Sequence, residues 1–75
     1  MDIREIFAAN LRRARRAAGM SQEDLAHLAD IDRTYVSALE RGVYAVSIDV
    51  IDRIAIALRI EPAELLARPR RTKSS

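Results

Sequence analysis

The placement of the residues that break helices constrains this sequence more than any other feature. The 75 residues include only two glycines and two prolines, and all four lie between or after stretches with apolar residues at three- and four-residue spacing. That spacing puts apolar side chains on one face of a helix. No run of alternating apolar and polar residues indicates a strand. The sequence therefore predicts an all-α fold.

Signals at the helix ends divide the chain into five predicted helices. Ser21, Asp32 and Ser47 are suited to be N-caps, because their side-chain oxygens can accept hydrogen bonds from the first free backbone N–H groups. Gly19 and Gly42 are suited to the left-handed conformation that ends many helices. With these caps and stops included, the predicted helices cover about residues 2–18, 21–30, 32–42, 48–59 and 62–67.

The composition limits the classes of function. The chain has no cysteine, which excludes disulfides and thiolate metal sites, and its one histidine, His27, cannot form a zinc site alone. No apolar run approaches the roughly 20 residues that span a bilayer, and the charged start has no signal-peptide core. We expect a cytoplasmic protein that binds no metal, cofactor, small molecule or membrane.

The charge is distributed unevenly along the chain. Residues 1–67 hold nine arginines against eleven acidic residues, whereas residues 68–75 hold four basic residues and no acid. We predict one folded domain over residues 1–67 and a basic, disordered tail over residues 68–75. Because the folded part is not basic as a whole, a nucleic-acid site would need its basic residues gathered on one face.

Residues 21–42 hold two short predicted helices joined by about three residues, which fits either a helix-turn-helix or a simple αα-hairpin. Ala26 is small where two helices must approach, and Val36 and Leu39 suit the core side of the second helix, which favours the helix-turn-helix. The opposite side carries no acidic residue. It consists of Arg33, Thr34, Ser37, Ala38 and Arg41, with Tyr35 beside them. Such a face fits a DNA major groove, but a solvated helix face has a similar composition.

Several spaced segments resemble the Cro and phage-repressor helix-turn-helix family, often called XRE-type. The likeness covers residues 5–67 and is carried by "LRRARRAAGMSQEDLA", "DRTYVSALERG" and "SIDVIDRIAIALRIEPAELL". Within this family the chain is most similar to the small regulators that accompany restriction–modification systems, which often carry "RTY" and "LERG". Two departures concern the loop over residues 43–46, which lacks the usual Asn-Pro and has no basic residue.

The resemblance implies a compact five-helix, lambda-repressor-like domain with the helix-turn-helix in its second and third helices. The third helix is then the recognition helix. Its expected base contacts are Arg33, Thr34, Ser37 and Ala38.

The resemblance also implies contacts around the recognition helix. Gln22 is expected to support that helix and to contact a phosphate or a base, and Arg15 and Glu40 to form a partly buried ion pair that fixes the first helix against the third. The other candidate DNA contacts are Tyr35, Arg41, Ser21, Tyr44 and Arg12.

Apolar residues exceed what the small core needs. Such a surplus indicates an interface, because soluble proteins seldom expose a large apolar patch otherwise. We predict a two-fold homodimer through the end of the fourth helix and the fifth helix. Its candidate residues are Ile48, Val50, Ile56, Ile60, Leu65 and Leu66, of which Leu65 and Ile60 are the ones most expected to cap the core.

These expectations combine into a dimeric, sequence-specific DNA-binding transcriptional regulator that acts on palindromic operator DNA. A rival interpretation is a protein-interaction module, such as an antitoxin that also binds DNA. An enzyme is disfavoured, because the single histidine and the carboxylates placed as helix caps or surface charges do not form a catalytic group.

Overall fold

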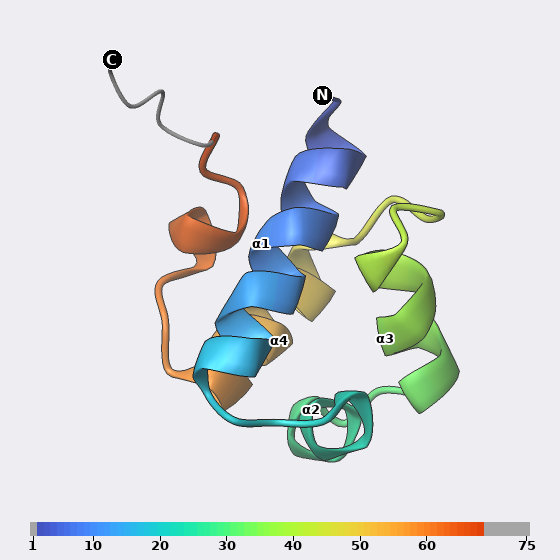
Figure 1. Ribbon diagram of the computed structural model, residues 1–75, viewed down its shortest axis with the longest axis vertical. Helices are drawn as coiled ribbons and strands as arrows, with labels where there is room; N and C mark the ends of the chain where they lie inside the picture. Colours follow the sequence, from blue (N-terminus) through green and yellow to red (C-terminus); the bar gives the residue numbers. More distant parts are fainter. Residues whose placement is uncertain (1, 69–75) are drawn as a thin grey trace.

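The computed structural model describes residues 2–68, and this part of the chain is all-helical. Figure 1 shows α1 through the middle of the molecule, with α3 on one side and the short C-terminal helix on the other; α2 crosses one end and α4 lies behind α1. The elements are α1 (Ile3–Ala17), α2 (Gln22–Ala29), α3 (Arg33–Glu40), α4 (Ile48–Leu58) and the 3-10 helix η1 (Pro62–Leu65). Met1 and residues 69–75, which include most of the predicted basic tail, lie outside the described residues.

The helices start at the predicted caps. Ser21 and Asp24 form a reciprocal capping box, in which each side chain accepts a hydrogen bond of 3.0 Å from the other residue's backbone N–H. Asp32 caps α3 and Ser47 caps α4 in the same role. The caps satisfy donors that would otherwise lack partners, and they set where α2, α3 and α4 begin.

The helix ends use left-handed residues. Gly19 and Gly42 both have φ of 71°, as expected from glycine after a helix. Asp30 ends α2 at φ 57°, a conformation that aspartate tolerates better than most side chains. Arg59 ends α4 at φ 59°, which the sequence did not indicate, because arginine seldom adopts this conformation.

The fifth predicted helix, over residues 62–67, starts at Pro62 as expected but is a 3-10 helix that ends at Leu65, so a fifth α-helix is not confirmed. The structure has four α-helices and a single 3-10 turn, Pro62–Leu65, within residues 2–68. Its backbone bonds span three residues, from Glu64 to Glu61 and from Leu66 to Ala63. The turn stops there because Leu65 enters the core with no exposed surface, and the next carbonyls bond to α1 instead of extending a helix.

One core joins all five elements. Leu11, Leu25, Leu39, Ile54 and Leu65 each have no exposed surface and come from five different elements. Burying one such side chain contributes about 1.5–3 kcal/mol, so each element is held by at least one anchor. No helix within residues 2–68 is both long enough and apolar enough to cross a membrane.

Candidate nucleic-acid interface

The α2–α3 pair has a tight connection that fixes the two helices relative to each other. Asp30 turns the chain in the left-handed conformation, and the Ile31 N–H then donates to the Ala26 carbonyl at 2.9 Å. Ala26 is buried where α2 meets its neighbours. The three residues between the helices allow little variation in their angle, which is the property that a helix-turn-helix needs.

One side of α3 is covered and the other is open. Val36 and Leu39 have no exposed surface, whereas Arg33 and Thr34 are exposed and Ser37 is half-buried. The open side carries no carboxylate from α3 itself, because Glu40, the only acidic residue of the helix, is 3% exposed. The absence of outward negative charge suits a surface that approaches phosphates.

Ala38 does not belong to the open side, which corrects the expectation that it contacts a base. Its side chain is buried, with 4% exposed. α3 packs against both α1 and α2. Two neighbours cover more of its surface than a single packed face would. A methyl group in this position fills the core and is not available to DNA.

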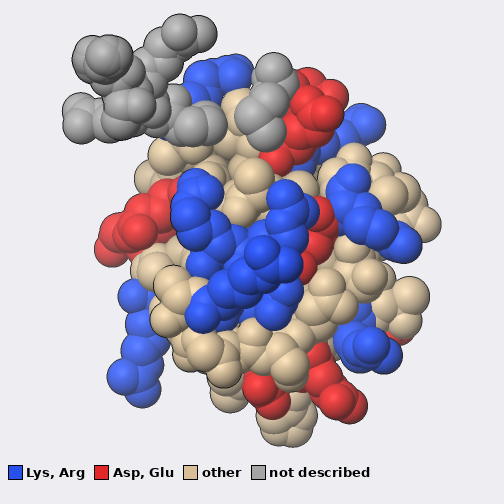
Figure 2. Space-filling model, viewed as in Figure 1, with Lys and Arg blue, Asp and Glu red and all other residues tan. Residues whose placement is uncertain are grey.

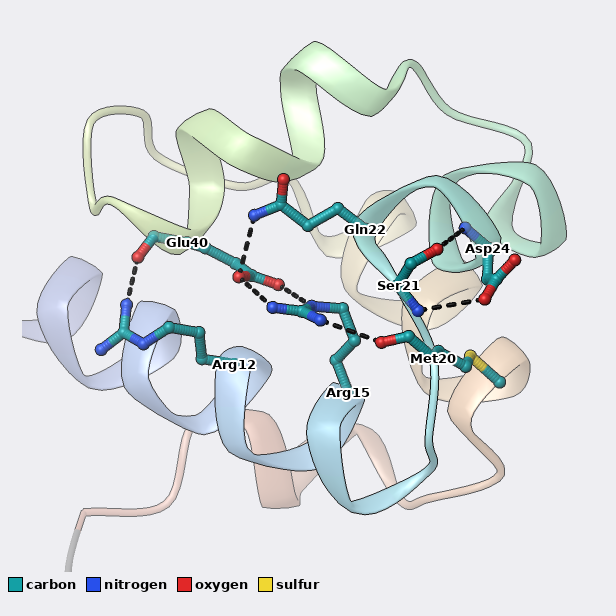
Figure 3. Close-up of polar contacts among 7 residues, drawn as sticks. All are labelled: Arg12, Arg15, Met20, Ser21, Gln22, Asp24 and Glu40. Carbon is teal, nitrogen blue, oxygen red and sulfur yellow. Dashed lines mark hydrogen bonds and ion pairs between the residues drawn. The ribbon is translucent and has the colours of Figure 1, made fainter.

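Glu40 is the centre of a buried hydrogen-bond network (Figure 3). Arg15 donates to both carboxylate oxygens, from Nε at 2.6 Å and from Nη2 at 2.9 Å. Its Nη1 donates to the Met20 carbonyl at 2.9 Å. Gln22 donates from Nε2 to Glu40 Oε1 at 3.1 Å. The network ties α1, the α1–α2 loop and the start of α2 to the last turn of α3, and the expected Arg15–Glu40 pair is present.

Arg12 lies beside this network and has a structural contact. Its Nη1 donates to the backbone carbonyl of Glu40 (Figure 3). A cation at this position complements the negative end of the α3 dipole. Arg12 thus supports the recognition helix in the free protein, and its expected DNA contact remains a proposal.

The network changes the ionisation of Glu40. Burial by itself would raise the pKa of Glu40, but the hydrogen bonds from Arg15 and Gln22 and the nearby positive charges outweigh burial, so its pKa lies below the ordinary 4.5. The same carboxylate raises the pKa of Arg15. The folded protein therefore favours the charged form of both groups.

A pH dependence of stability follows from the lowered pKa of Glu40. The unfolded chain takes up a proton at Glu40 near pH 4.5, and the folded chain does so only at lower pH. Unfolding is therefore favoured as the pH falls below about 4.5. We expect a decline in the urea midpoint over this range that is shallower in Glu40→Gln, which cannot titrate. Equal slopes in the two proteins would contradict this assignment.

The remaining candidates lie around the open side of α3. Arg41 is exposed directly after the helix, and Ser21 is exposed with its hydroxyl used in the cap. The rings of Tyr35 and Tyr44 are 6.4 Å apart between centroids, in a tilted arrangement, within the range of favourable aromatic pairs. The loop over residues 43–46, which has no basic residue, is therefore in contact with α3 through Tyr44. The Tyr44 side chain is 56% exposed.

A cluster of positive side chains lies on the face shown in Figure 2, and a nucleic-acid site in a chain of this composition requires such a cluster. Figure 2 shows them concentrated over α1 in the view in which α3 lies at one side. α1 supplies five arginines, Arg4, Arg12, Arg13, Arg15 and Arg16. Arg15 is used by Glu40, Arg12 donates to the Glu40 carbonyl and Arg13 to Asn10. No group of three acidic or histidine side chains within residues 2–68 is placed to hold a metal ion.

Comparisons with known proteins show which family has this arrangement of helices. A helix-turn-helix family model matches residues 11–65. The chain belongs to this helix-turn-helix family. Control protein C.BamHI of Bacillus amyloliquefaciens is 44% identical over 66 residues, which cover 87% of this chain and 82% of that protein. The structure of the restriction-modification controller protein C.AhdI from Aeromonas hydrophila matches with a TM-score of 0.81 at 48% identity, over 83% of this chain and 94% of that one.

A third relative has been solved on DNA. The restriction-modification controller protein C.Esp1396I, in a tetramer with its natural 35 base-pair operator, matches with a TM-score of 0.79 at 28% identity, over 87% of this chain and 86% of that one. The resemblance inferred from the sequence segments is therefore confirmed, both for the helix-turn-helix family and for its restriction–modification control proteins.

Three residues of the predicted dimer face of this helix-turn-helix protein are exposed at the surface. Ile48, Ile56 and Leu66 are 83%, 68% and 38% exposed. Val50 and Ile60 are half-buried and pack against the core. Val50 lies one turn before Arg53, which reaches the Asp30 carbonyl at the end of α2, so Val50 is on the α2 side of α4.

Leu65, one of the two interface candidates expected to cap the core, is confirmed as a core residue and is removed from the predicted interface. It has no exposed surface, because the 3-10 turn points it into the core between α1 and α4. A partner copy cannot reach it without opening the domain. Leu65 anchors η1, and its neighbour Leu66 is left as the exposed apolar residue of this segment.

The sequence analysis missed one buried polar residue, Asn10 on α1. Its Nδ2 donates to the Leu65 carbonyl at 3.0 Å and to the Ala67 carbonyl at 2.9 Å. Its Oδ1 accepts a hydrogen bond of 2.6 Å from Arg13. The side chain is 6% exposed. Asn10 lies between the apolar residues Phe7 and Leu11, which are both buried, and this spacing was the signal that could have identified it.

Proposed function

We propose that the protein is a homodimeric transcription regulator that recognises palindromic operator DNA by inserting α3 into the major groove. The observation that carries the proposal is the acid-free open side of α3, held rigid by the buried Glu40 network. A groove about 12 Å wide accepts one helix. The proposal includes no catalytic role and places the protein in the cytoplasm with the DNA that it regulates.

Base readout is assigned to Arg33, Thr34 and Ser37. The exposed Arg33 guanidinium can donate two hydrogen bonds to guanine, and the hydroxyls of Thr34 and Ser37 can contact either kind of base edge. Thr34 lies in the first turn of α3, where its backbone N–H is already bound to Asp32. Its side chain is therefore presented by a fixed backbone.

Gln22 can serve the network and DNA at the same time. One N–H of its amide is used by Glu40, while the second N–H remains free to donate. Figure 3 shows the amide oxygen directed away from Glu40. This leaves one donor and one acceptor for a phosphate or an adenine edge, on a side chain whose orientation Glu40 fixes. Tyr35 and Arg41 complete the proposed contacts with phosphates.

The dimer gives the recognition helices their spacing. A single helix-turn-helix head reads only a short half-site, whereas two heads related by a two-fold axis read half-sites about 34–36 Å apart. The C.Esp1396I relative was solved as a tetramer with its operator, which supports assembly on DNA as part of this proposal. The exposed Ile48, Ile56 and Leu66 are the proposed contacts between copies.

The rival interaction-module function makes a different prediction about salt. A regulator that displaces counterions from phosphates loses affinity steeply as salt rises, with a linear relation between log K and log salt concentration. A module that binds only protein has no DNA affinity to lose. Fluorescence anisotropy with an operator duplex at several salt concentrations distinguishes the two.

Replacing Arg33 tests the specificity of the proposed site. We expect Arg33→Ala to reduce discrimination between operator and random DNA by about 1–3 kcal/mol, the usual contribution of a bidentate arginine–guanine contact. Arg53→Ala is a matched control, since it removes the same charge from α4, where Arg53 makes only one contact of 3.4 Å. Equal losses on operator and random DNA would reassign Arg33 to the phosphates.

A further inference from the structure

Leu66 lies in a segment that has few means of holding a fixed position. η1 is a single turn, Leu66 follows it, and residues 67 and 68, the last that the structure describes, have no regular secondary structure. Leu66 also shares a shallow apolar groove with Ile3 and Ile51. An interface residue in such a segment binds well only if the backbone around it is ordered beforehand, since ordering it on association costs free energy.

Besides the buried Leu65, one side chain of α1 holds the backbone of this segment. Asn10 bonds the carbonyl before Leu66 and the carbonyl after it, at 3.0 and 2.9 Å. Both bonds use the two hydrogens of one carboxamide nitrogen, and Arg13 holds the amide oxygen on the opposite side at 2.6 Å. A carboxamide is required here, because aspartate would offer only acceptors to two carbonyl oxygens.

From this geometry we propose that Asn10 is the positioning residue of the homodimer face: it clamps the backbone on both sides of Leu66 so that the side chain is presented to a second copy of the chain. This inference rests on the homodimer proposed above. Asn10 does not contact the partner and acts through the segment that it holds. It lies on the flank of α1 that faces η1, while α3 packs on the other side of α1 (Figure 1).

The dimer dissociation constant of the full chain tests the role of Asn10. In sedimentation equilibrium, we expect Asn10→Ala and Asn10→Asp to weaken dimerisation about tenfold or more, the effect of losing hydrogen bonds that order the interface. The control is Asp24→Ala, which breaks the capping box of α2 and so loses stability far from Leu66. We expect it to dimerise within about twofold of the unaltered protein. Thermal melts of all variants separate a loss of stability from a loss of dimerisation.

A dissociation constant for folded Asn10→Ala within twofold of the unaltered protein overturns the inference. Failure of the underlying homodimer gives a different result, because the unaltered chain then remains monomeric. If Leu66→Glu dimerises as tightly as the unaltered chain, the homodimer exists but meets through another surface.

A second measurement needs no substitution and decides the matter if Asn10→Ala does not fold. Asn10 and Gln22 are the only asparagine and glutamine in the sequence, so the side-chain amide region of a nitrogen-15 correlation spectrum contains two NH₂ pairs. We expect the Asn10 pair to keep the shift of a hydrogen-bonded carboxamide when dilution dissociates the dimer, and operator DNA to shift the Gln22 pair. An Asn10 pair that takes the shift of a free, solvated carboxamide in the monomer overturns the inference.

Discussion

Glu40→Ala is expected to lower the free energy of unfolding by about 3–5 kcal/mol, the cost of leaving one member of a buried ion pair without its partner. Arg15 is 11% exposed and Glu40 3% exposed at the side chain, so water cannot readily replace the lost carboxylate. The change also removes the acceptor of Gln22. For a domain of this size each kcal/mol shifts the melting temperature by about 4–8 °C. A fall of at least about 12 °C should appear in a thermal melt followed by circular dichroism.

Two further variants distinguish the effect of the lost charge on stability from the effect of the lost side chain. Glu40→Gln keeps an acceptor for Arg15 and should lose less stability than Glu40→Ala. The double variant Glu40→Ala with Arg15→Met should recover part of the loss, because it no longer buries an uncompensated guanidinium. An unchanged melting midpoint in Glu40→Ala would falsify the buried network as a source of stability, since an exposed pair contributes under about 1 kcal/mol.

Leu66→Glu is expected to produce monomers that bind a full palindrome about 10²- to 10⁴-fold more weakly, which is the usual gain from linking two binding modules. A carboxylate at this position would have to be desolvated between two copies. Sedimentation velocity at tens of micromolar gives the assembly state, and anisotropy with operator DNA gives the affinity. Binding to a single half-site should change little, because Leu66 lies on the η1 side of α1, away from α3.

Leu28→Glu provides the matched control for that experiment. Leu28 is 57% exposed, more than Leu66 at 38%, and it lies on α2 away from η1. The same change of leucine to glutamate there should leave the dimer intact. If both variants remain dimers, the two copies meet through another surface.

The parts of the fold that the sequence predicted are those with local signals. Ser21, Asp32 and Ser47 cap the helices where their side chains can reach the first free N–H groups, and Gly19 and Gly42 end two of them. These features depend on residues within one or two turns. They can be recognised without knowing what packs where.

The errors arose where distant residues decide the structure. Ala38 was expected at DNA, yet it is buried where α3 packs against α1 and α2. The predicted fifth helix was limited to one turn because Asn10, 55 residues before Leu65, takes its carbonyl. Arg59 adopts a positive φ without glycine, and no local pattern marks it. For the proposed DNA contacts, the sequence supplied the residue types and the family, and only the folded chain shows which of them are exposed.

The position of α1 fixes the distance between the two recognition helices of the proposed dimer. Arg12 and Arg15 attach α3 to one flank of this helix, and Asn10 attaches the segment around Leu66 to the other. The two recognition helices of a dimer are then separated by two copies of one stiff element, and not by a flexible linker. One base pair added between two half-sites moves them about 3.4 Å apart and turns one by about 34° around the DNA axis. A protein built in this way selects operators by the phase of their half-sites as well as by their bases.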